Sequence, residues 1–143
     1  MILSRAWATI ISAFILLVLD AGYIYTIKNG YLAMLRNIQG SNPVKINMYA
    51  IVFCYAFVIG GLILYVLPYA QKMIDTTETN SVMNKVYVAV IVGGLFGGIV
   101  YGIYNTTNMA IFKDFSLQFA LFDIVWGSFL FYISTLVYLL LRK

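Results

Sequence analysis

Four long apolar runs, separated by short polar segments, dominate the hydrophobic pattern of the chain. A helix of ~20 apolar residues is long enough to cross the hydrocarbon core of a bilayer. Each run therefore predicts one membrane-spanning helix, and together the runs use most of the 143 residues. We expect a single integral membrane domain, residues 1–143, folded as an all-α, up-down bundle of four transmembrane helices. The predicted spans are residues 7–27, 46–67, 86–110 and 117–141.

The composition excludes a soluble domain. Apolar residues make up 63% of the chain and charged residues only 10%, whereas about 25% of the residues in soluble domains are charged. The mean hydropathy of +0.93 agrees with this interpretation. The single Cys54 can form no intrachain disulfide, so the sequence does not indicate a redox compartment.

The segment that follows the first span is amphipathic. Its apolar positions repeat at helical spacing, while polar side chains occupy the other side. We predict that the first span ends at residues 28–30 and that a short interfacial helix covers residues 31–40, with Gly40 as its C-cap. An ordered loop is the alternative. The apolar set is Tyr31, Met34, Leu35 and Ile38, and the polar set is Arg36, Asn37 and Gln39.

The connections between the runs set the topology. Pro68 predicts the end of the second span, because proline interrupts the hydrogen-bond ladder of a helix. Residues 71–85 are the most hydrophilic stretch and predict an exposed loop. Only residues 112–116 separate the third and fourth spans, so these two helices should be adjacent and antiparallel.

Glycines at four-residue spacing mark the third span as a packing surface. At 100° per residue they share a face with the polar residues of the same span. Such small residues let a neighbouring helix backbone approach closely where no hydrophobic drive exists. The fourth span carries one further glycine on its polar face. We expect helix-packing contacts at Gly94, Gly98, Gly102 and Gly127.

The up-down topology places polar residues of three spans at a similar depth. Asp20 and Asn105 lie one or two turns before the ends of two parallel spans, and Asp123 lies about two turns after the fourth span begins. A carboxylate at such a depth costs ~2.5–3.5 kcal/mol on insertion scales, so it should face the bundle interior. The predicted buried polar site consists of Asp20, Tyr23, Tyr101, Asn105, Asn108, Asp123 and Trp126.

This polar layer has three interpretations. It could join the helices through interhelical hydrogen bonds, form a binding or proton-relay site open to one membrane face, or supply carboxylates for acid/base catalysis. The chain has no nucleophile-plus-base pair, phosphate loop or dinucleotide motif, so we predict no enzyme activity and no cofactor. Without His, only oxygen ligands from Asp20, Asp123 and Asn105 could hold a hard cation, and we predict no metal site.

The basic residues are divided almost evenly between the two predicted membrane faces. Five lie on the face of the termini and four on the opposite face, so the positive-inside rule favours cytoplasmic termini by a narrow margin. No basic stripe with interleaved aromatic residues lies outside the spans. We expect the lipid bilayer and other membrane or assembly proteins as partners, and no nucleic acid. The two groups are Arg5, Lys72, Lys85, Arg142 and Lys143, and Lys28, Arg36, Lys45 and Lys113.

Three separated patches carry a family resemblance. They are the pair Leu19-Asp20, the run LFGGIVYGIYNTTNMA over residues 95–110, and the segment DIVWG over residues 123–127. Together they resemble the predicted four-helix membrane proteins of the DUF2177 family, over nearly the whole chain. In that family the residue after the tyrosine is usually Asp, whereas this chain has Asn105 after Tyr104. This departure removes one carboxylate and disfavours a mechanism that needs an acid there.

The resemblance implies a fold rather than an activity. It extends to bacterial members and to members in large DNA viruses, and a viral origin would imply a structural component of a virion membrane. We therefore expect a non-enzymatic structural or assembly component of a membrane. The alternative is a small-solute or proton-handling membrane protein built on the buried Asp/Asn/Tyr site.

Overall fold

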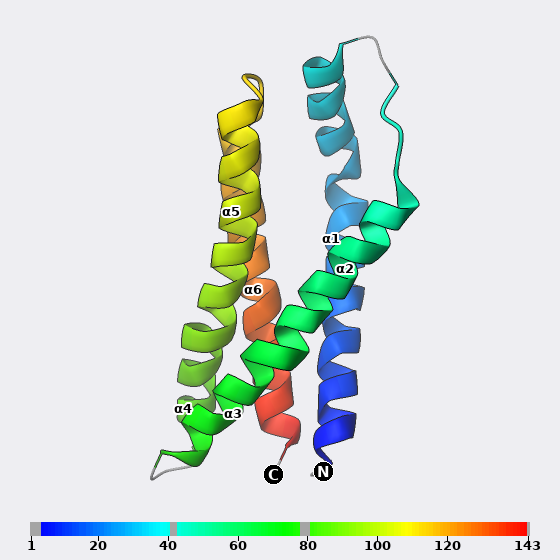
Figure 1. Ribbon diagram of the computed structural model, residues 1–143. Coiled ribbons are helices and arrows are strands. Elements are labelled where there is room, and N and C mark those ends of the chain that lie inside the picture. Colours follow the sequence, from blue (N-terminus) through cyan, green and yellow to red (C-terminus); the bar gives the residue numbers. More distant parts are fainter. Residues whose placement is uncertain (1–3, 41–42, 78–80, 143) are drawn as a thin grey trace.

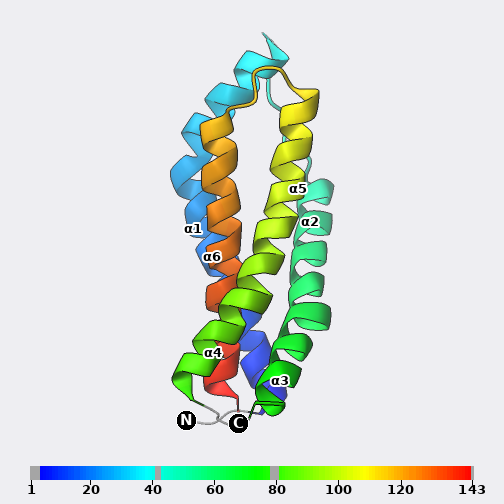
Figure 2. The same cartoon turned by 90° about the vertical axis from the view of Figure 1, so that its left-hand side faces the viewer.

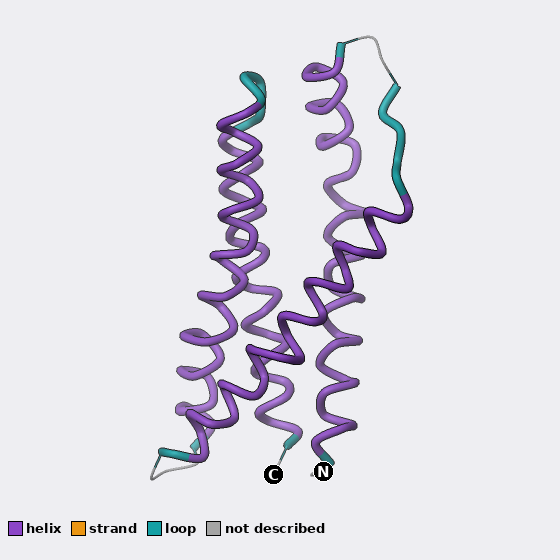
Figure 3. Tube along the Cα trace, viewed as in Figure 1, coloured by secondary structure: helices purple, strands orange, loops and turns teal. Residues whose placement is uncertain are grey.

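The computed structural model describes residues 4–40, 43–77 and 81–142, and it confirms the predicted fold of four long apolar helices (Figure 1). Helices account for nearly all of the described chain (Figure 3). The two termini lie at the same end of the bundle, as an even number of crossings requires. The four candidate membrane spans are Arg5–Gln39, Met48–Asp75, Val82–Ile111 and Leu117–Leu141.

The first helix, α1 (Arg5–Gln39), is longer than predicted. It passes without a break through residues 28–30, where we expected the first span to end. The expected separate interfacial helix is therefore wrong, and its residues form the last turns of α1. Neither residue 29 nor residue 30 is a proline, so nothing there forces the backbone out of the helix. The predicted cap is correct, because α1 ends at Gly40 with a φ of 66°, a conformation that glycine adopts readily.

The end of α1 packs on residues of the third and fourth spans and of the turn between them. Met34 is buried with Phe115 and Ala120, at the turn between the third and fourth spans. The Tyr31 hydroxyl forms a hydrogen bond of 2.9 Å with the Tyr104 hydroxyl of the third span. These contacts explain why the amphipathic residues 31–39 continue α1 and do not form a separate helix.

The second span consists of α2 (Met48–Gly61), a π-helical segment η1 (Leu62–Val66) and α3 (Leu67–Asp75). It does not stop at Pro68, contrary to our prediction. Proline lies in the first turn of α3, directly after the wider π turn. Local π adjustments re-satisfy the backbone groups that proline leaves free in a membrane helix. The exposed connection is correspondingly shorter than residues 71–85, because α3 continues to Asp75 and the next helix starts at Val82.

The third span combines α4 (Val82–Val88), the π-helical segment η2 (Ala89–Gly94) and α5 (Leu95–Ile111). The fourth span is α6 (Leu117–Leu141), with the predicted bounds. The turn over residues 112–116 makes α5 and α6 adjacent and antiparallel, as predicted (Figure 2). The Ser81 and Ser116 side chains cap the helices that follow them by accepting hydrogen bonds from backbone N–H groups.

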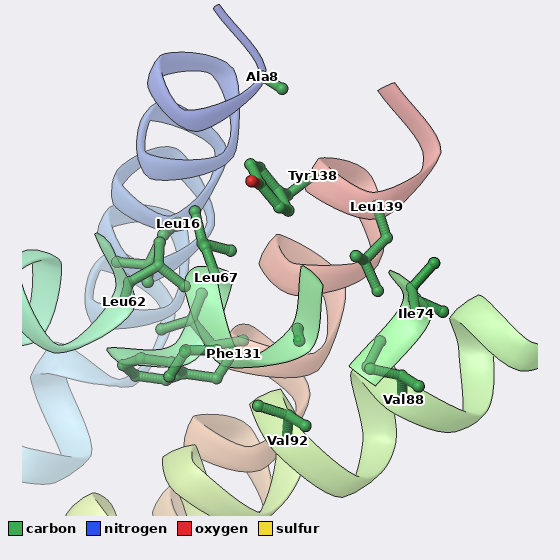
Figure 4. Packing of buried hydrophobic residues seen from close by; sticks show 14 residues of the cluster. Ala8, Leu16, Leu62, Leu67, Ile74, Val88, Val92, Phe131, Tyr138 and Leu139 are labelled. Atoms are coloured by element: carbon green, nitrogen blue, oxygen red, sulfur yellow. The ribbon is translucent and has the colours of Figure 1, made fainter. Parts of the chain in front are cut away.

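Helix α6 is the centre of the bundle, since it packs on α1, α3, α4, α5 and both π segments. Its buried positions recur every three or four residues, and they include the predicted polar face. The main apolar core lies toward the end of the bundle that carries the termini (Figure 4). Its largest fully buried apolar side chains are Tyr138, Phe131, Leu16, Leu62, Leu67, Leu130 and Leu139.

Helix α2 is the least packed element. None of its residues is buried, although α3 in the same span buries four, and Figure 1 shows this span crossing the bundle diagonally. The only side-chain hydrogen bond from α2 to another described span is donated by Tyr55. The second span is therefore held at its α3 end by apolar packing and at its α2 end by a polar contact.

The glycines that allow close helix packing differ partly from those we predicted. Gly93 and Gly97 are buried against α6, where an added Cβ would collide with backbone oxygens of Phe131 and Gly127. Gly98 meets only the Ser128 hydroxyl, at 2.7 Å from the Cβ position. The Cβ position of Gly102 has no atom within 4 Å, so Gly102 forms no packing contact.

The difference is one of helical register. Counting back from the buried Asn105 in steps of four residues leads to Tyr101, Gly97 and Gly93. Gly94 and Gly98 lie at the edge of that face, and Gly102 lies beyond it. Gly94 accordingly has its nearest neighbours only at 3.8 Å from the Cβ position.

We predict that Gly97→Ala destabilises the bundle by about 1–3 kcal/mol, because the new methyl group would overpack the α5–α6 contact. Gly102→Ala is the matched control. It should leave stability unchanged or raise it by up to about 1 kcal/mol, since alanine favours a helix and its methyl group would meet open space. Reversible unfolding in detergent micelles measures both effects. Equal losses for the two variants would contradict the packing described here.

Candidate functional site: a polar layer inside the bundle

The Asp20 carboxylate is the most connected polar group of the layer. Its side chain is 7% exposed, and it accepts hydrogen bonds from the other three spans. The Tyr55 hydroxyl donates to Oδ2 at 2.8 Å, and the Tyr101 hydroxyl and the Trp126 Nε1 group donate to Oδ1 at 3.2 Å. One carboxylate thus joins all four membrane-spanning helices.

Gly127 makes the contact between Tyr101 and Asp20 possible. A Cβ at position 127 would collide with the ring of Tyr101, so a side chain there would displace the ring. The predicted packing glycine of the fourth span therefore also positions a hydroxyl donor. In this way the close approach of α5 and α6 and the hydrogen bonding of Asp20 depend on the same residue.

Tyr23 of α1 and Trp126 of α6 form a stacked aromatic pair next to the buried polar residues. Their rings stack with centroids 4.5 Å apart and an interplanar angle of 10°. Both residues also line an apolar groove of about 400 Å³ between α1 and α6. Trp126 thus contacts both the Asp20 carboxylate and this apolar groove. The remaining lining residues of the groove are Ile27, Phe119, Phe122, Val125 and Phe129.

Asp123 lies beside Asn105 in the same layer, and the two side chains are 9% and 1% exposed. The Asn105 Nδ2 group donates to Asp123 Oδ2 at 2.7 Å and to the backbone oxygen of Tyr101 at 2.9 Å. Asp123 is therefore held by α5, whereas Asp20 is held by three other spans.

Two buried polar atoms of the layer have no protein partner. They are the Oδ1 atom of Asn105 and the Nδ2 atom of Asn108, which are the only such side-chain atoms in the described part of the chain. The large majority of buried polar atoms in proteins are hydrogen-bonded. This unpaired acceptor and this unpaired donor lie one turn apart on the same side of α5.

The structure brings the predicted polar residues into one region. Direct contacts link Asp20 with Tyr101 and Trp126, Trp126 with Tyr23, and Asn105 with Asp123 and Tyr101. Asn108 makes no side-chain hydrogen bond. The sequence analysis missed Tyr55. Its depth in the membrane could have identified it. Tyr55 lies in the half of the second span that is nearest the same membrane face as the polar layer.

The chemistry available to this site is that of two carboxylates without a basic partner. No described Lys or Arg forms an ion pair with Asp20 or Asp123. Within the described residues, no group of three or more His, Cys, Asp or Glu side chains could hold a metal ion. Both Asp20 oxygens accept protein hydrogen bonds, whereas Asn105 Oδ1 and Asn108 Nδ2 have no protein partner.

Comparison with known proteins places the chain in a family. A model of the predicted membrane protein family DUF2177 matches residues 6–140. The chain belongs to the DUF2177 family. No curated protein and no solved structure matches it. The DUF2177 match includes all residues of the polar layer and agrees with the four membrane-spanning helices.

For this DUF2177 protein we predict that Asp20→Leu lowers the free energy of unfolding by about 2–4 kcal/mol, because it leaves three donors without an acceptor in an apolar medium. Asp20→Asn should lower it by less than half as much, since the amide keeps one acceptor oxygen. Reversible unfolding in micelles is the measurement. Equal effects of the two substitutions would show that hydrogen bonding at Asp20 does not stabilise the bundle.

A double-mutant cycle isolates the contact between Tyr55 and Asp20. Tyr55→Phe should destabilise the native protein by about 1 kcal/mol and have almost no effect in the Asp20→Leu background, because groups in direct contact couple. Tyr87→Phe is the control, since Tyr87 is 61% exposed and lies in another span. Additive effects of the Tyr55 and Asp20 substitutions would contradict the contact.

Proposed function

We propose that this DUF2177 protein is a non-enzymatic structural or assembly component of a membrane. The observation that supports this proposal is the use of both Asp20 oxygens by donors from three other spans. A carboxylate that reacts or binds a substrate needs a free oxygen or an exchangeable partner. Asp20 instead has the bonding pattern of a group that fixes the arrangement of helices.

The energetics are consistent with a structural role. Interhelical hydrogen bonds in membrane proteins contribute ~0.6 kcal/mol each on average. The larger effect is the penalty for leaving the same donors unpaired in hydrocarbon. The main effect of the polar layer is therefore to specify one arrangement of the four helices, and its contribution to their stability is smaller.

The surface of the protein suits lipid and partner helices. Large apolar side chains are exposed on every span, including Phe14 at 64%, Phe57 at 79%, Ile103 at 64% and Phe122 at 64%. In a bilayer these side chains contact acyl chains or other membrane proteins. The short connections leave little soluble surface, so association through the spans is the route that we propose for assembly.

We predict that the tagged protein, solubilised from its native membrane in a mild detergent, co-purifies with membrane or assembly proteins at a fixed stoichiometry. Chemical cross-linking before solubilisation, followed by mass spectrometry, identifies the partners. The Asp20→Leu variant is the comparison, because loss of the helix arrangement should abolish the association. A monodisperse monomer without partners would contradict the proposal. Recovery from purified virus particles would favour the role in a virion membrane.

The unpaired atoms of the layer favour a second candidate function, a small-solute or proton-handling protein. Asn105 Oδ1 and Asn108 Nδ2 are buried without protein partners, and the Nδ2 group of Asn105 donates to Asp123. In membrane proteins, buried ionisable residues frequently mark ion or proton pathways. Reconstitution into vesicles with an internal pH dye tests this candidate. The structural role predicts no proton flux above that of empty vesicles, and flux that is lost in Asp123→Asn would favour the second candidate instead.

We further propose that both termini face the cytoplasm. Five basic residues are assigned to that face and four to the other, and Lys and Arg accumulate on the cytoplasmic side of membrane proteins. A fluorescent protein fused to the C-terminus should therefore be fluorescent in bacteria, and alkaline phosphatase at the same position should be inactive. The opposite result for both reporters would reverse the orientation.

A further inference from the structure

Helices α1 and α6 are in close contact near the termini and are held apart by aromatic rings farther along the bundle. Near the termini Ser12 is fully buried, and its hydroxyl donates to the Ser134 backbone oxygen at 2.7 Å. Toward residues 112–116 the contact is ring on ring, because Tyr23 stacks on Trp126 with centroids 4.5 Å apart. Large rings keep helix backbones farther apart than small residues do. The groove between α1 and α6 therefore opens in this half of the bundle.

The depth of the groove matches one leaflet of a bilayer. On α6 its lining runs from Phe119, in the first turn of the helix, to Phe129, the middle residue of the 25-residue span. Between these two residues an α-helix rises ~15 Å, and the hydrocarbon core of a bilayer is ~30 Å thick. The groove of about 400 Å³ thus extends from the membrane face of residues 112–116 to the midplane.

The side chains that line the groove are large and almost entirely apolar. Only Tyr23 and Trp126 carry a polar group, and the Trp126 Nε1 group already donates to Asp20. None of the lining residues is Gly, Ala or Ser, the residues that allow a neighbouring helix to approach closely in a membrane. The groove therefore suits a narrow apolar chain and does not suit a further helix.

The groove is open to the lipid, and its outer end lies at a basic membrane face. Phe122 and Val125, which line it, are 64% and 67% exposed. The chain on that face, residues 28–47 and 112–116, has four basic residues against the single Asp114, a net charge of +3. Lys and Arg bind phosphate groups. The face therefore attracts a molecule with a phosphate at the membrane surface and an apolar chain below it.

We propose that the groove between α1 and α6 binds one acyl chain of a membrane phospholipid, from the leaflet on the side of residues 112–116. The chain packs on the stacked rings of Tyr23 and Trp126. Because Trp126 also donates to Asp20, the bound lipid restrains the position of one of the donors that hold this carboxylate. The inference goes beyond both candidate functions and depends on neither.

Trp126 can report directly on the groove. The chain has two tryptophans, so Trp7→Phe leaves Trp126 as the only one. The probe is a phosphatidylcholine with brominated acyl chains, since bromine quenches tryptophan emission on contact. It is added to the Trp7→Phe protein in a steroid-based detergent that has no alkyl chain. We expect the emission to fall and to level off at one lipid per protein. No quenching, or quenching that rises in proportion to added lipid, would overturn the proposal.

Val125→Phe in the same background fills the groove with a ring. It should raise the dissociation constant of the brominated lipid at least about tenfold, because the ring occupies the volume of the chain. Val52→Phe is the matched control and should leave the constant unchanged, since Val52 is 65% exposed and lies in α2. An unchanged constant for Val125→Phe would contradict the assignment to this groove. If Val125→Phe does not fold, the titration of the Trp7→Phe protein decides.

The same titration distinguishes a lipid from a second copy of the chain. A dimer that shields Trp126 from the brominated lipid would assign the groove to the second copy and overturn the proposal. Saturating quenching in a protein without partners keeps the inference and contradicts the structural role. Co-purified partners without quenching do the reverse. The proton-flux measurement uses Asp123, which does not line the groove.

Discussion

The arrangement of the helices depends on one buried carboxylate. An aspartate inside a bilayer is unfavourable by ~2.5–3.5 kcal/mol on insertion scales, and Asp20 is tolerated because Tyr55, Tyr101 and Trp126 donate to it. These donors come from α2, α5 and α6, so the depth and rotation of every span are tied to one point on α1. Hydrophobic burial cannot provide such registration, because lipid is as apolar as the helix surfaces.

Close backbone contact and polar bonding support each other around this point. The buried glycines of the third span bring it against α6, and Gly127 leaves room for the Tyr101 ring that reaches Asp20. Helix α2 lies outside this arrangement. It buries no residue, and its only described side-chain bond to another span is the one from Tyr55. The bundle is therefore a compact group of α1, α5 and α6, to which the second span is attached through η1, α3 and one hydroxyl.

The sequence predicted most of the fold, because span length and composition alone determine which segments cross a bilayer. The bounds of α6 were correct, since Ser116 and Arg142 mark both ends. Three features were not predictable from local pattern. The helix passes through residues 28–30 because the end of α1 packs on distant residues, Pro68 is accommodated by a π turn, and Gly97 rather than Gly102 packs because the buried Asn105 sets the register. Tyr55 was missed because only its depth in the second span, and not its local sequence pattern, marks it.

The two carboxylates of the layer have different environments, and this difference connects the structural and the binding interpretations. Both oxygens of Asp20 accept bonds from protein donors, whereas Asp123 bonds Asn105, whose own oxygen still lacks a donor. A buried polar network rigidifies the core where every member is paired, and an unpaired member is energetically costly. Asp20 can therefore hold the helices together. The bonds that join the four spans meet at Asp20, so a substitution at Asp123, Asn105 or Asn108 leaves those bonds in place.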